Sequence, residues 1–116
     1  MPQRILLTGA RGVGKRSVAE VLVSTHGFVH ENQNEAGRGL PDLLLDAHAH
    51  DRNAIVIWSE PLNAPTIGLA RHLGFEWVEL GGKVARRGSE IEPRLVAARD
   101  AKGSSRTIGA ILAEIV

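Results

Sequence analysis

Short apolar runs alternate along the chain with longer segments whose apolar residues recur at helical spacing. Residues 4–8 ("RILLT") and 54–58 ("AIVIW") are almost continuously apolar, as is typical of strands buried on both faces. Residues 75–80 ("FEWVEL") partly alternate, and residues 28–30 ("FVH") form a shorter candidate. The pattern therefore predicts four strands.

Helical spacing follows the first strand, where Val18, Val21 and Leu22 share a face of a helix that begins near Lys15 and ends at Gly27. Three later segments are also expected to be helical, each with a proline in its first turn. They begin at Pro41, at Pro65 (ending at Gly74) and at Ile91 (running to Ala98, with Pro93 in its first turn). A last helix is predicted with Ser104 or Ser105 as N-cap and an apolar stripe formed by Ile108, Ile111, Leu112 and Ile115.

Strands that alternate with helices predict an α/β fold, a three-layer α/β/α sandwich with a mostly parallel sheet. A length of 116 residues with 43% hydrophobic content suits one globular domain over residues 1–116. The polar segment 31–39 is the one long interruption of this pattern, and such loops are often functional.

Composition excludes several classes of function. A net charge of +1 gives no general attraction to nucleic acid or to an anionic membrane, and two Phe, two Trp and no Tyr offer no stacking platform for bases. The chain has no Cys and no apolar stretch of membrane length. We therefore expect a cytoplasmic protein with a small-molecule partner, no nucleic acid and no membrane.

The stretch "TGARGVGKRS" carries the candidate chemistry. Gly9, Gly14 and Lys15 match the phosphate-loop (P-loop) pattern G-x-x-x-x-G-K, placed between a buried strand and a helix. Glycines allow successive backbone N–H groups to converge, the first helical turn has free N–H groups, and the lysine adds a full positive charge. This combination predicts a site for the phosphates of ATP.

The hydroxyl of this loop stands one place later than the common pattern requires, because Arg16 follows the lysine and Ser17 comes next. The spacing G-x-x-G-x-G-K-x-[ST] resembles the adenylate-kinase-like nucleoside and nucleotide monophosphate kinases. The whole chain resembles a shortened phage-type deoxynucleotide monophosphate kinase, through "HGFVH", "AIVIWSE", "LARHLGFEWVEL", "GSE" and "GSSRTIGAILAEIV" in order. The resemblance implies a P-loop NTPase-like fold and transfer of a phosphoryl group from ATP-Mg²⁺ to a nucleoside monophosphate.

Roles follow from the loop pattern and from this resemblance. Lys15 would bridge to the γ-phosphate, Ser17 and Glu60 would place Mg²⁺, Arg38 would bind the acceptor, and Arg86 and Arg87 would hold transition-state charge. The residues expected to contact ATP are Gly9, Ala10, Arg11, Gly12, Val13, Gly14, Lys15, Arg16 and Ser17. The arginines also fit a simpler interpretation as exposed, solvated charges.

Two alternatives remain open at this point. Glu60 and Leu62 stand where these kinases usually carry Asp and Arg, and the chain is much shorter than they are, which suits an inactive nucleotide-binding module. A chain this short is also compatible with a homo-oligomer that completes its site from a second subunit.

The other alternative is a Rossmann dinucleotide site, because "TGARGVGK" resembles the T-G-x-x-G-x-x-G opening of extended short-chain dehydrogenases. In that register the third glycine falls on Lys15, while Glu31 could bind a ribose. The catalytic tyrosine of those enzymes has no counterpart in this chain, and a guanine-reading N-K-x-D element is also missing.

Overall fold

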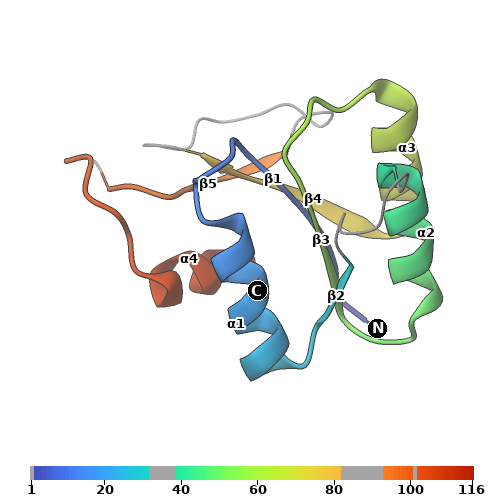
Figure 1. Ribbon diagram of the computed structural model, residues 1–116, viewed down its shortest axis with the longest axis horizontal. Coiled ribbons are helices and arrows are strands. Elements are labelled where there is room, and N and C mark those ends of the chain that lie inside the picture. Colours follow the sequence, from blue (N-terminus) through green and yellow to red (C-terminus); the bar gives the residue numbers. More distant parts are fainter. Residues whose placement is uncertain (1, 32–38, 82–92, 101) are drawn as a thin grey trace.

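The computed structural model describes residues 2–31, 39–81, 93–100 and 102–116 (Figure 1). Strands and helices alternate through most of this part of the chain. In order, the elements are β1 (Arg4–Thr8), α1 (Lys15–His26), β2 (Val29–Glu31), α2 (Leu40–Ala49), β3 (Ala54–Trp58), α3 (Ala64–His72), β4 (Phe75–Gly81), β5 (Arg94–Ala97) and α4 (Ile108–Ile115).

The five strands form one parallel sheet in the order β2-β3-β1-β4-β5. β1 lies at its centre, and Thr8 at the end of β1 is opposite Trp58 of β3 and Glu79 of β4. The carboxyl ends of these three strands therefore meet at one edge of the sheet, which is where open α/β sheets bind ligands.

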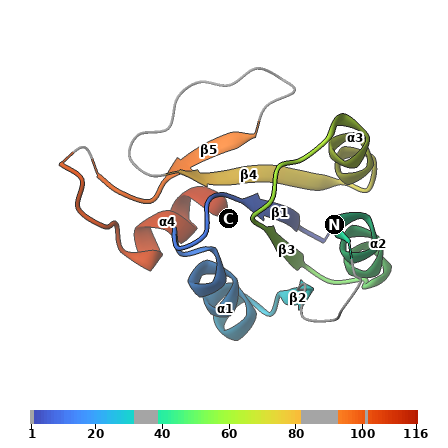
Figure 2. The ribbon, with the colours of Figure 1, turned by 45° about the horizontal axis from the view of Figure 1, so that its top comes forward.

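Helices cover both faces of the sheet, α1 and α4 on one side and α2 and α3 on the other (Figures 1 and 2). The side chains of β1 alternate between two cores: Ile5 and Leu7 pack with α1 and α4, whereas Leu6 packs with α2. All three are fully buried, and each such side chain contributes roughly 1.5–3 kcal/mol to folding. The predicted three-layer α/β/α sandwich with a parallel sheet is confirmed.

The C-terminal end of α1 explains why the next strand begins one residue later than predicted. Gly27 is left-handed (φ 68°), and its N–H and that of Phe28 both approach the carbonyl of Leu22. Phe28 therefore belongs to the C-terminal turn of the helix, and the strand expected at 28–30 runs from Val29 to Glu31.

The prediction of a helix over residues 91–98 is wrong in the part that the structure describes. Residues 94–97 form β5, which pairs in parallel with β4 and buries Val96. Leu and Ala favour a helix by local propensity, but pairing with a buried neighbouring strand overrides that preference.

The N-cap of α4 also differs from the prediction. The Thr107 hydroxyl oxygen accepts from the Ala110 N–H (3.1 Å), while Ser104 lies in a turn organised by the Asp100 carboxylate. No helix in the described residues is both long and apolar enough to cross a membrane.

Candidate functional site

The conformation of the loop between β1 and α1 depends on its glycines. Gly9, Gly12 and Gly14 all have positive φ (146°, 84° and 105°), which other residues adopt at a cost. A Cβ on Gly9 would lie 2.5 Å from the Leu80 carbonyl oxygen of β4, so this position also requires a glycine for space. The loop therefore passes directly over the end of the neighbouring strand.

Lys15, the first residue of α1, folds back into this loop. Its Nζ donates to the carbonyl oxygens of Gly9 (2.6 Å) and Ala10 (2.8 Å), and only 6% of the residue is exposed. Burial, and secondarily the positive charge of Arg11, lower the pKa of Lys15 from its ordinary value. The lysine charge therefore lies inside the loop. The first turn of α1, whose backbone N–H groups have no partner within the helix, lies next to it.

This donor set fits a triphosphate. Gly14 caps α1 without a side-chain hydrogen bond to the first turn, and the dipole of the helix favours an anion there. The loop and Lys15 thus provide both the backbone donors and the cation that polyphosphate binding requires.

The residues predicted to place Mg²⁺ are exposed. Ser17 lies on the first turn of α1, and the Glu60 carboxylate follows β3, where it pairs with Arg11 at 3.5 Å. Within the described residues, no group of three or more His, Asp or Glu side chains is arranged to hold a metal by itself. Such a sparse set fits Mg²⁺, which usually binds through one or two protein oxygens together with phosphates and waters.

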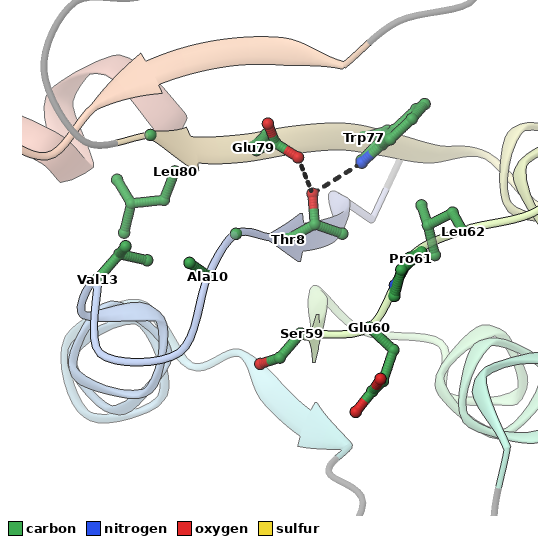
Figure 3. A pocket seen from close by; sticks show the side chains of 12 residues that line it. Thr8, Ala10, Val13, Ser59, Glu60, Pro61, Leu62, Trp77, Glu79 and Leu80 are labelled. Carbon is green, nitrogen blue, oxygen red and sulfur yellow. Dashed lines mark hydrogen bonds between the residues drawn. The ribbon is translucent and has the colours of Figure 1, made fainter.

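A cavity of about 410 Å³ adjoins the loop (Figure 3). It is formed where the carboxyl ends of β1, β3 and β4 meet. The lining residues are Thr8, Gly9, Ala10, Val13, Ser59, Glu60, Pro61, Leu62, Trp77, Glu79, Leu80 and Gly81.

A chain of hydrogen bonds fixes one wall of this cavity (Figure 3). The Trp77 indole N–H donates to the Thr8 hydroxyl oxygen (2.9 Å), and the Thr8 hydroxyl donates to Glu79 Oε1 over a longer distance of 3.4 Å. An indole N–H can only donate, so the hydroxyl must accept it and has its own proton left for the carboxylate. Thr8 is 4% exposed, which keeps its hydroxyl in this orientation.

The structure brings only part of the predicted site together. Among the predicted residues, Gly9, Ala10, Val13 and Glu60 line the cavity beside the loop. Arg11, Arg16 and Ser17 are exposed. The predicted arginines Arg38, Arg86 and Arg87 lie outside the described residues.

Three residues of this site escaped the sequence analysis: Thr8, Trp77 and Glu79. The available signal was the alternation in "FEWVEL", which places Trp77 and Glu79 on the same face of a strand. That signal becomes informative only with the knowledge that this strand lies beside β1.

The order of the strands does not suit the Rossmann alternative. A classical dinucleotide fold has the order 3-2-1-4-5-6, with the second strand beside the first. Here β3 separates β2 from β1, and the Glu31 carboxylate at the end of β2 approaches the His50 ring (Nε2 to Oε1, 2.8 Å). Glu31 is therefore engaged one strand away from the position that a ribose-binding acid would need.

Comparisons with known proteins find solved structures with a similar fold. The fold is similar to that of a sugar kinase from a Janibacter species, with a TM-score of 0.60, 11% sequence identity, and coverage of 99% of this chain and 92% of that one. It is also similar to a gluconokinase from Sinorhizobium meliloti, with a TM-score of 0.55, 17% identity, and coverage of 97% and 89%. No protein-family model matches the sequence, and no curated protein matches it significantly. The chain therefore shares the fold of these two kinases.

Proposed function

We propose that the protein is a phosphotransferase that uses ATP-Mg²⁺ to phosphorylate a small-molecule acceptor. One observation carries the proposal: a glycine loop with a buried lysine stands at the carboxyl edge of the sheet, directly beside a cavity. The kinase fold of the two structural neighbours supports the same class of reaction.

In this proposal the protein mainly positions the reactants and neutralises charge. The loop N–H groups cradle the phosphates, and Lys15 exchanges its contacts with the Gly9 and Ala10 carbonyls for the outer phosphate oxygens. Ser17 and Glu60 supply the protein oxygens for Mg²⁺, which neutralises charge on the transferred group when bound. The cavity holds the acceptor beside the loop.

The resemblance in sequence makes a nucleoside monophosphate one candidate acceptor. Its phosphate would need the cations Arg38, Arg86 and Arg87, which stay predictions because they lie outside the described residues. The cytoplasmic location and the homo-oligomer also stay predictions.

A second acceptor class, a sugar-like hydroxyl compound, is favoured by the cavity lining. The described lining carries two carboxylates, Glu60 and Glu79, and the names of the neighbours are those of a sugar kinase and a gluconokinase.

A thermal-shift screen of nucleotides, with and without Mg²⁺, tests the proposed function. Ligand at a hundred times its Kd should stabilise the protein by about 2.7 kcal/mol. We expect stabilisation by ATP, increased by Mg²⁺. Stabilisation by NAD(P)H without stabilisation by ATP would contradict the proposal.

The same screen, extended by an assay of ADP release, separates an enzyme from an inactive module. An inactive nucleotide-binding module would be stabilised by ATP yet release no ADP with any acceptor.

A further inference from the structure

The charged side chains that line the cavity are the carboxylates Glu60 and Glu79. The cations of the loop lie outside the lining: Lys15 contacts the Gly9 and Ala10 carbonyls, and Arg11 pairs with Glu60. The opposite wall, from β4, presents Glu79. Among the described residues none forms an ion pair with Glu79, and none of the described lining residues is a Lys, Arg or His.

An acceptor phosphate would be repelled at this wall. A carboxylate beside a phosphate costs free energy unless a cation lies between them, and the described wall offers none. A hydroxyl group, in contrast, can donate its proton to the carboxylate, which has about four acceptor sites and uses one of them for Thr8.

The rest of the wall suits the carbon face of such a compound. The Trp77 ring has its N–H satisfied by Thr8, so its remaining ring surface offers apolar contact area. Pro61 and Leu62 supply further apolar surface on the other side of the cavity. Mostly apolar walls with a few well-placed polar groups are typical of small-molecule sites.

We propose that Glu79, oriented by Thr8 and Trp77, selects a neutral acceptor that carries several hydroxyl groups, a sugar or polyol, and disfavours nucleoside monophosphates. This inference rests on the proposed function, because it names the acceptor of the same reaction. Glu79 binds the acceptor directly, whereas Thr8 and Trp77 are positioning residues.

The test measures ADP release from ATP-Mg²⁺ by the full chain with three groups of acceptors. The probes are neutral sugars and polyols (glucose, ribose and glycerol), an amino sugar (glucosamine), and nucleoside monophosphates (AMP and dGMP). We expect a neutral sugar or polyol to be the best acceptor. Its KM should rise at least tenfold in Glu79→Gln, while the KM for ATP changes less than twofold.

Glu76→Gln is the matched control. Glu76 is on the same strand, lies outside the cavity and pairs with Arg94. In Glu76→Gln the amide oxygen can still accept a hydrogen bond from Arg94. This variant should leave both KM values unchanged.

Two variants of Thr8 test the positioning role. Thr8→Val removes the hydroxyl that orients Glu79 and should raise the acceptor KM several-fold with little change in kcat. Thr8→Ser keeps the hydroxyl and should behave like the parent protein, which a purely steric role of Thr8 does not predict.

Two results would overturn the inference while the proposed function stands: a nucleoside monophosphate or the amino sugar as the best acceptor, or an unchanged acceptor KM in Glu79→Gln. The failure of the proposed function looks different, because the protein would then release no ADP with any compound tested, whether or not ATP stabilises it.

Discussion

The phosphate loop and the adjoining cavity share one edge of the sheet, yet they are built in different ways. The loop is one continuous stretch from Gly9 to Lys15 with three positive-φ glycines, and the phosphate binding proposed for it would use its backbone N–H groups. The cavity gathers side chains from segments far apart in the sequence, such as Thr8, Glu60 and Glu79. Its chemistry therefore depends on which side chains the sheet brings together.

This difference predicts how each region tolerates substitution. Changes of glycine conformation should disturb the loop, while most side-chain changes there should be mild, except at Lys15. The cavity should respond to single side-chain exchanges that leave the backbone untouched. Each region can thus be altered without the other, except where they meet: at the pair of Glu60 with Arg11, and at Gly9 and Leu80.

Gly9→Ala should have the largest effect, because it acts at this point of contact. The new Cβ would stand 2.5 Å from a backbone oxygen of β4, at a φ of 146° that alanine rarely adopts. Overpacking and backbone strain together should lower the free energy of unfolding by about 3 kcal/mol. Urea denaturation measures this loss.

Gly68→Ala is the control for this substitution. Gly68 lies in α3 with open space around its Cα, so alanine there should stabilise the protein by about 0.5–1 kcal/mol. Equal stability of the two variants would show that the loop does not depend on its contact with β4.

Lys15→Ala should have the next largest effect and should separate the two regions. Loss of the main loop cation should weaken ATP binding at least tenfold, which corresponds to about 1.4 kcal/mol. Binding of the acceptor should change much less, because Lys15 does not line the cavity. Calorimetric titration with ATP measures the effect.

Lys102→Ala is the control away from the loop, since Lys102 is exposed and carries the same charge. It should change ATP affinity only slightly. Equal ATP affinity of Lys15→Ala and the parent protein would argue decisively against a phosphate loop.

Glu60→Gln tests the residue that belongs to both regions, because Glu60 lines the cavity and pairs with Arg11 of the loop. If Glu60 places Mg²⁺, the variant should lose most of the strengthening of ATP binding by Mg²⁺, about fivefold or roughly 1 kcal/mol for an exposed charge contact. Metal-free ATP binding should be retained. Titrations with and without Mg²⁺ should show the change, and Glu20→Gln on α1 should not.

An unchanged Mg²⁺ dependence in Glu60→Gln would make Glu60 a residue of the cavity alone. The loop would then be the complete nucleotide site, and the inactive-module alternative would gain support.

The contrast between the continuous loop and the dispersed cavity also explains which features the sequence could predict. The loop and the strands at 4–8 and 54–58 were predictable because their signals are local: a glycine spacing and continuous apolar runs. The edge strand β5 was mistaken for a helix because Leu95, Ala97 and Ala98 favour helix locally, and only pairing with β4 makes the segment extended.

The wall of the cavity was hidden for a related reason. Thr8 precedes the glycine pattern, and Trp77 and Glu79 resemble ordinary strand residues. Their hydrogen-bonded chain exists only because β4 lies beside β1, a pairing across about seventy residues that periodicity does not reveal.

The smallest expected effect concerns His30 on β2, which belongs to neither region. Its Nε2 is buried with no partner among the described residues, and burial, followed by the charge of Arg16, lowers the pKa of His30 below its ordinary value of 6.5. The unfolded chain then binds this proton more readily than the folded chain. Stability that is present above about pH 6.5 should therefore be lost as the pH falls toward the lowered pKa.

Urea midpoints at about pH 7.5 and about pH 5.5 measure this dependence. The parent protein should lose more stability between the two than His30→Leu, which cannot bind the proton, whereas His72→Gln, at an exposed position in α3, should follow the parent. ATP affinity at neutral pH should be the same in all three proteins, because β3 lies between β2 and β1, the strand that leads into the loop. An equal pH dependence of His30→Leu and the parent would show that His30 takes up its proton as easily in the folded chain as in the unfolded one. A loss of ATP affinity in His30→Leu would show that the nucleotide site extends to β2, beyond the single stretch from which the loop is built.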